Sequence, residues 1–150
     1  MSSDGDLAAR QAALVASLTA GAAVPPGFDA RLIRVARGAL LRKRAGEVAR
    51  QWPLLASAFA DGWADEFARW AARRPPQGSL RDGWDLARDL AVRGALPAAA
   101  AEELAAREAA WHYDGRSNPR RRRLPAVGRA AGSVAVQAAG RVRVVRRAAE

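Results

Sequence analysis

The sequence predicts an all-α protein, a compact bundle of about six or seven short helices followed by a basic, poorly ordered C-terminal tail. Three observations predict this fold. Alanine, leucine and arginine, which are good helix formers, dominate the chain. Apolar residues recur at helical spacing as far as about residue 112. Residues that favour strands are sparse before residue 130.

The first two helical stretches have clear start and stop signals. The first helix is expected over residues 7–20, with Asp6 as its N-cap, and the prolines of GAAVPPG end it. Asp29 is the expected N-cap of a second stretch that reaches Gln51. The apolar stripe of this stretch moves by about a third of a turn near Gly38, so we expect a kink or break there.

The remaining helices are shorter. Pro53 fits the first turn of a short helix that follows Trp52. The next helix has a buried stripe at positions i, i+4 and i+7, formed by Trp63, Phe67 and Trp70.

Two further helices precede the tail. Ser79 and Asp82 resemble a capping box that starts one of them. Pro97 fits the start of the last helix, which is expected to carry Leu104 and Trp111 on one face.

Charge divides the chain into a helical body, residues 1–115, and an arginine-rich tail, residues 116–150. Residues 1–110 contain 15 basic and 13 acidic residues, whereas residues 111–150 contain 10 arginines and 2 acids. Most of the net charge of +10 therefore belongs to the tail. Within the tail, SVAVQ and RVRVV alternate with period two, which is typical of a small hairpin; a frayed basic helix and disorder are the alternatives.

Residue types that carry catalysis are scarce. The chain has no cysteine, which excludes thiolate metal sites, and His112 is its single histidine. Asp82, Asp85 and Asp89 follow a helical spacing, but neighbouring arginines can pair with them on a solvated face. We therefore expect no catalytic, cofactor-binding or metal-binding residue and no enzyme activity in this chain. The acidic N-terminus and the lack of a long apolar run predict a cytoplasmic protein without a membrane segment.

Short motifs follow one another in a fixed order between Gln11 and His112. They are Pro25-Pro26-Gly27, Trp52-Pro53, Phe67, Pro75-Pro76 and the segment from Glu108 to Trp111-His112. In order and spacing they resemble the N-terminal helical domain of a bacterial family labelled as DNA-binding, whose members are partners of multinuclear nonheme iron oxidases. The methanobactin-maturation partner subunit is related to this family.

The chain also departs from that family. Members commonly show Tyr-Arg-Asn-Asn in the second helix, and only Arg37 of these four residues is present here. Larger relatives carry a second, β-rich domain where this chain has its short basic tail. The chain therefore looks like a compact variant.

The resemblance implies a non-catalytic accessory subunit. Such a subunit would bind the iron-dependent oxidase and help present a ribosomally made precursor peptide for modification, with the iron in the oxidase and no cofactor in this chain. The alternative is a DNA- or RNA-binding protein that uses the basic tail, because arginine runs attract phosphates. The candidate binding residues for a partner or nucleic acid are Arg37, Arg120, Arg121, Arg122, Arg123, Arg141, Arg143, Arg146 and Arg147.

Overall fold

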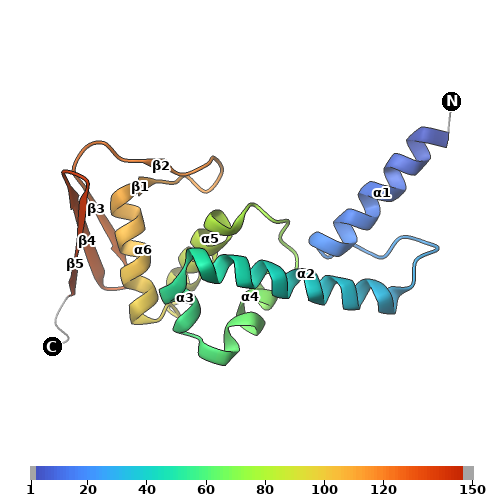
Figure 1. The fold of residues 1–150 in the computed structure, drawn as a ribbon, viewed down its shortest axis with the longest axis horizontal. Coiled ribbons are helices and arrows are strands. Elements are labelled where there is room, and N and C mark those ends of the chain that lie inside the picture. Colours follow the sequence, from blue (N-terminus) through green and yellow to red (C-terminus); the bar gives the residue numbers. More distant parts are fainter. Residues whose placement is uncertain (1–2, 147–150) are drawn as a thin grey trace. The chain divides into compact units, whose positions relative to one another are not determined.

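The computed structural model describes residues 3–146 and divides the chain into two compact units (Figure 1). The first unit contains the residues up to 47 and residues 61–77, and the second contains residues 48–60 and those from 78 onward. Seven helical segments are described: α1 (Ser3–Thr19), α2 (Ala30–Gln51), α3 (Pro53–Ser57), the 3-10 turn η1 (Ala60–Gly62), α4 (Trp63–Ala71), α5 (Ser79–Val92) and α6 (Ala98–Ala110).

The prediction of an all-α fold is wrong. The described part of the chain also contains five strands in two antiparallel sheets, so the fold mixes helices and strands. The strands are β1 (Trp111–His112), β2 (Arg120–Arg121), β3 (Ala126–Ala130), β4 (Ser133–Ala138) and β5 (Arg141–Arg146). The first two pair with each other, and the last three form a sheet in the order β3-β4-β5.

The two turns of the larger sheet explain why the tail forms strands. Each turn is a two-residue connection, Ala131-Gly132 and Ala139-Gly140, and all four residues have positive φ angles. Such turns match the natural twist of antiparallel strands. The expectation of a poorly ordered tail is therefore wrong for residues up to 146. The hairpin alternative for SVAVQ and RVRVV is confirmed, because Val134 pairs with Val145 and Ala138 pairs with Arg141.

Helix α6 supplies the support that an isolated hairpin lacks. One face of the β3-β4-β5 sheet packs against α6, mainly through β3 and β4 (Figure 1). On α6 the alanines Ala101, Ala105 and Ala109 are fully buried. Gly128 of β3 permits this close approach, because a Cβ there would lie 2.5 Å from the backbone nitrogen of Ala109 and closer still to the carbonyl oxygen of Ala105.

Helix α2 is continuous through Gly38, so the expected break is absent. The shift of its apolar stripe reflects burial. Leu32 and Leu40, in the first part, are 65% and 42% exposed, whereas Ala45 and Val48 are buried. The N-cap prediction is confirmed, since Asp29 Oδ1 accepts a hydrogen bond of 2.7 Å from the backbone N–H of residue 31.

The aromatic stripe of α4 is confirmed as core. Trp63, Phe67 and Trp70 are buried, and their neighbouring ring centroids lie 5.7 and 5.8 Å apart. The indole N–H of Trp63 donates to the carbonyl oxygen of Ala45, 3.0 Å away. This bond satisfies the polar end of a buried tryptophan.

Three predicted helix ends differ from the structure. Helix α1 begins at Ser3, so Asp6 lies inside it and pairs with Arg10 at 3.1 Å instead of capping it. Helix α5 has Gly78 at its N-cap and no side-chain capping bond, so the expected capping box is not formed. Helix α6 ends at Ala110, which places Trp111 on β1 and not on a helix face.

Within residues 3–146, no helix combines the length and the apolar character required to cross a membrane.

Candidate partner and peptide interface

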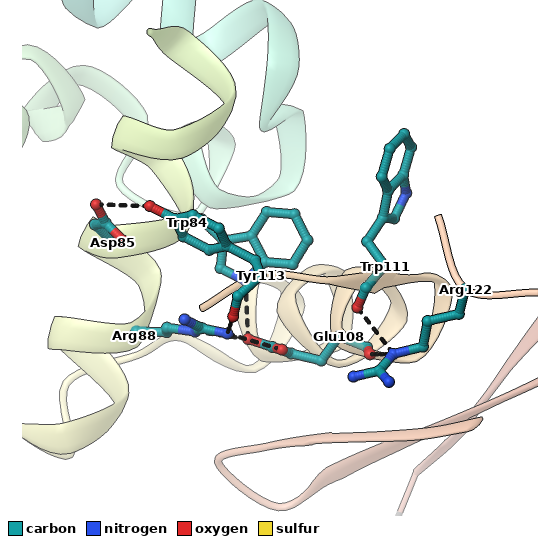
Figure 2. Close-up of polar contacts among 7 residues, drawn as sticks. All are labelled: Trp84, Asp85, Arg88, Glu108, Trp111, Tyr113 and Arg122. Carbon is teal, nitrogen blue, oxygen red and sulfur yellow. Dashed lines mark hydrogen bonds and ion pairs between the residues drawn. The ribbon is translucent and has the colours of Figure 1, made fainter. Parts of the chain in front are cut away.

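A polar cluster centred on Glu108 joins α5, α6 and the segment after α6 (Figure 2). The Glu108 carboxylate accepts hydrogen bonds from the indole N–H of Trp84 at 2.8 Å and from Arg88 at 2.7 and 3.0 Å. Arg88 also donates to the backbone carbonyl oxygen of Tyr113 at 2.8 Å. One carboxylate thus satisfies a buried tryptophan and an arginine that holds the next segment in place.

Tyr113 extends this cluster to Asp85. The phenol O–H of Tyr113 donates to the Asp85 carboxylate, 3.1 Å away, and the tyrosine ring packs on Trp84 with centroids 5.1 Å apart. Burial raises the pKa of both Asp85 and Tyr113. These groups hold α5 and α6 together, and we assign them a structural role.

The arginine run after α6 divides into residues with different environments. Arg122 Nε donates to the carbonyl oxygens of Glu108 and Trp111 at 3.2 and 3.0 Å (Figure 2). The backbone N–H of Arg122 also donates to the carbonyl oxygen of Ala110, 2.9 Å away. Arg122 therefore caps the C-terminal end of α6.

The neighbouring arginines lie differently. The Arg121 guanidinium lies over the Trp111 ring, 5.1 Å from its centroid, and the Trp111 side chain points away from the Glu108 cluster (Figure 2). Arg120 and Arg123 are exposed. The four consecutive arginines therefore do not form one continuous cationic patch.

The other candidate arginines belong to β5 or to the first unit. Arg141 and Arg143 are exposed on β5. The backbone of Arg146 is part of β5, whereas its side chain and all of Arg147 lie outside the described residues. Arg37 donates a hydrogen bond to the backbone carbonyl oxygen of Ala72, within the first unit. The structure thus gives Arg37 a packing role between α2 and the end of α4.

An open groove of about 350 Å³ lies between α3, α6 and β5. Its apolar residues are Leu54 from α3, Ala106 from α6 and Val144 from β5. Its charged residues are Glu102, Glu103 and Arg107, all on α6.

The ionised groups at this groove are held in place. Glu103 accepts a 2.8 Å hydrogen bond from the backbone N–H of Leu55, at the start of α3, and pairs with Arg107 at 3.6 Å. The Arg107 guanidinium lies over the Trp52 ring, 4.1 Å from its centroid. Burial raises the pKa of Glu103 and lowers the pKa of Arg107. These contacts fix the positions of Glu103 and Arg107 on the α6 wall of the groove.

A smaller polar pocket of about 190 Å³ lies in the β1–β2 region, lined by His112, Asp114, Ser117, Asn118 and Arg120. Asp114 accepts hydrogen bonds from the backbone N–H groups of Arg116 and Ser117, at 2.8 and 2.7 Å. These bonds lower the pKa of Asp114 from 3.8 to about 2.

This shift predicts a pH effect on stability. The folded-state pKa of Asp114 lies below its ordinary value, so the unfolded chain binds more protons between about pH 4 and pH 2, and stability is lost as the pH falls through this window. Thermal unfolding followed at several pH values should show a smaller acid-induced loss in Asp114→Asn than in the wild type. Asp65→Asn, an exposed carboxylate on α4, is the control; an equal effect there would contradict the prediction.

The remaining candidate groups for catalysis stay dispersed. Across residues 3–146, no three His, Asp or Glu side chains lie close enough together to hold a metal ion. His112 is exposed on β1. Asp89 pairs with Arg93 at 3.1 Å, as expected. Asp82, however, is only 1% exposed, so the expectation of a fully solvated aspartate face was wrong.

The first unit exposes several large apolar side chains. Leu7 and Val15 of α1 are each 57% exposed. Phe28, just before α2, is 42% exposed, and Leu32 and Val35 in the first turns of α2 are 65% and 63% exposed. Leu32 and Val35 are three residues apart and therefore lie on the same side of the helix.

The residues that line the groove were not predicted from the sequence. Leu54, Ala106 and Val144 come from three segments that are distant in the sequence, and none belongs to a recognisable motif. The period-two alternation of RVRVV was the single local signal, because it places Val144 on the opposite side of a strand from Arg143.

Together these features define a class of protein: a small helical domain whose last helix supports a three-stranded sheet with arginines on its edge strand. The chain belongs to the family described as SCO6045-like, C-terminal domain, whose model matches residues 8–92.

A "UPF0276 protein" from Streptomyces avermitilis is 39% identical over 89 residues, which cover 59% of this chain and 18% of that relative. The chain therefore corresponds to less than a fifth of the length of the curated relative it matches. No solved structure gives a significant match.

Proposed function

We propose that this chain is a non-catalytic accessory subunit of a multinuclear nonheme iron-dependent oxidase, and that it helps present a ribosomally made precursor peptide to that oxidase. In this proposal the iron belongs to the oxidase. The observation that carries the proposal is the exposure of large apolar side chains on α1, on α2 and between them. The proposal that this partner is a nonheme iron oxidase comes from the resemblance of the helical segment to known partners of such oxidases.

Leaving these apolar side chains in contact with water is unfavourable. Scattered single apolar residues are normal on a protein surface. Here Phe28, Leu32 and Val35 lie within eight residues of one another around the start of α2, and all are at least 42% exposed. Covering such side chains with a partner removes apolar area from water and favours association.

The relative from Streptomyces avermitilis is consistent with a partner role. Its matched segment is 18% of its length, so the domain occurs there as a minor part of a larger protein. A domain that is fused to a larger protein in one case can act as a separate binding subunit in another protein. The occurrence of the domain within a larger protein thus supports its association with a larger partner.

The double variant Leu32→Asp/Val35→Asp tests the docking surface. The tagged chain is coexpressed with a multinuclear nonheme iron oxidase encoded in the same genome. Copurification of the oxidase should fall at least about tenfold in the double variant, because two charges would be buried without partners. Both side chains are mostly exposed, so the variant should fold.

Leu124→Asp is the matched control, because Leu124 is 78% exposed in a loop of the second unit. The control should copurify like the wild type. Retention of the oxidase by the double variant would exclude this surface, and failure of the wild type to retain any oxidase would refute the proposed function.

The alternative is a DNA- or RNA-binding protein that uses the exposed arginines Arg120, Arg123, Arg141 and Arg143. Binding of this kind depends steeply on salt, because it releases counterions from the phosphates. If the chain binds short duplex DNA tightly at ~0.15 M salt, and Arg120→Glu/Arg123→Glu abolishes that binding, the alternative is favoured over the partner role.

A further inference from the structure

Strand β5 has an unpaired edge. In the described part of the chain, β4 is the single strand that pairs with β5, so the opposite edge of β5 presents free backbone N–H and C=O groups. Strand β5 is six residues long and carries no proline. An edge of this kind is a template for an added strand.

The groove between α3, α6 and β5 lies beside this edge. Helix α6 packs mainly against β3 and β4, so the side of β5 that faces α6 is only partly covered. Val142 and Val144 remain 38% and 40% exposed, and Val144 lines the groove together with Leu54 and Ala106. An added strand would therefore have an apolar recess for the side chains that it points toward α6.

The opposite side of β5 is cationic. Val144 pairs with Ala135, which is fully buried on the α6 side of the sheet. Arg143 pairs with Val136, which is exposed, so Arg143 lies on the outer side of the sheet. Since side chains alternate along a strand, Arg141 shares this outer side. Over residues 141–145, an added strand would meet Val142 and Val144 on the α6 side, and the two arginines together with Val145 on the outer side.

We propose that the free edge of β5 binds an extended acidic segment of the precursor peptide as a fourth strand of the sheet. Alternate residues of that segment place apolar side chains in the groove formed by Leu54, Ala106 and Val144. The intervening residues are acidic and lie beside Arg141 and Arg143. The identity of the ligand as a precursor peptide rests on the proposed function, whereas the chemistry of the segment follows from β5 and the groove.

The same observations disfavour two other occupants. A second copy of β5 would bring arginines beside arginines, and like charges on neighbouring strands are destabilising. A nucleic acid would approach a groove whose α6 side carries two carboxylates, Glu102 and Glu103, and a single arginine, Arg107, so the groove does not favour phosphates. An extended acidic peptide avoids both conflicts, because its apolar side faces the groove and its acids face the arginines.

The test measures fluorescence anisotropy of synthetic peptides with the full-length chain. The probe alternates glutamate and valine; a lysine–valine peptide tests charge, and a glutamate–valine peptide with N-methylated alternate residues tests backbone pairing. We expect the first probe to bind at ~0.15 M salt and both others to bind at least about tenfold more weakly.

Three variants locate the site. Arg143→Glu and Val144→Glu should each weaken binding of the glutamate–valine probe at least about tenfold. Arg129→Glu is the matched control, because Arg129 is exposed on the opposite edge strand, β3; it should change affinity by less than about threefold. Arg143 is exposed, so its variant remains informative if Val144→Glu fails to fold.

Hydrogen–deuterium exchange distinguishes strand addition from simple charge attraction, because only an added strand hydrogen-bonds to the β5 backbone amides and slows their exchange. Bound probe should slow exchange of β5 amides and leave those of β3 unchanged. The inference is overturned if the glutamate–valine probe does not bind, or if the N-methylated peptide binds equally well. It is also overturned if the β5 variants and Arg129→Glu behave alike, or if short duplex DNA binds this edge more tightly than the probe. Oxidase copurification without probe binding would refute the edge site alone, whereas probe binding without an oxidase would refute the partner role alone.

Discussion

Replacing Gly128 with valine is expected to destabilise the second unit by about 3 kcal/mol or more. A side chain at this position would overlap backbone atoms of α6, at Ala105 and Ala109, and backbone atoms cannot move aside like the end of a flexible side chain. The sheet would have to separate from the helix, exposing the buried alanines of α6. Urea unfolding followed by circular dichroism measures the change in the free energy of unfolding.

Gly46→Ala provides the control for this substitution. Gly46 lies inside α2, and a Cβ added there would meet no atom within 4 Å. Because alanine is the better helix former, this variant should be more stable by about 0.5–1 kcal/mol. A Gly128→Val protein as stable as the wild type would show that β3 does not pack on α6 as described.

Replacing Glu108 with alanine should have the second largest effect, a loss of about 2–4 kcal/mol in the free energy of unfolding. The variant leaves the indole N–H of Trp84 and the guanidinium of Arg88 without their carboxylate. Trp84 is fully buried, so water cannot replace the lost acceptor without disturbing the core. Urea unfolding gives the stability, and near-ultraviolet circular dichroism reports the environment of the tryptophan.

Glu108→Gln separates the charge from the hydrogen bond. The amide oxygen can still accept from Trp84, but it cannot form the paired, charge-assisted contact with Arg88. We expect this variant to lose about half as much stability as Glu108→Ala. A cost below about 0.5 kcal/mol for the alanine variant would contradict a structural role for this cluster.

The helical half of the fold was accessible from the sequence because its signals are local. The N-cap at Asp29 and the stripe of Trp63, Phe67 and Trp70 depend on neighbours within a few residues, and both were predicted correctly. The break at Gly38 was predicted wrongly, because a change from exposed to buried apolar residues along α2 looks like a change of direction. Periodicity alone cannot separate these two cases.

The sheet could not be established from local signals. Strand β3 reads Ala-Val-Gly-Arg-Ala, which has little strand propensity, and an isolated β4–β5 hairpin is marginal in water. The stabilising partner is the alanine face of α6, which resembles an ordinary helix surface in the sequence. The match between Gly128 and that face depends on residues about twenty positions apart, so composition could not reveal it.

The candidate site shows the same limit. The exposed arginines of β5 were identified from the sequence, but their separation onto one side of a strand requires the register with β4. The groove at Val144 also requires α3, which precedes β5 by more than eighty residues. The charge and the alternation of valine with arginine were therefore visible in the sequence, whereas the side of β5 that faces α6 was not.

The cap formed by Arg122 determines whether truncation or substitution is the better way to test the role of the tail. A chain truncated after residue 115 would lose the Arg122 guanidinium, which donates hydrogen bonds to the carbonyl oxygens at the end of α6. It would also lose the strands that cover Ala105 and Ala109. Truncation would thus remove positive charge and expose a helix in the same step, and lost binding could not be assigned to either. Charge-reversal substitutions at exposed positions such as Arg123 leave that cap intact and change only the electrostatics.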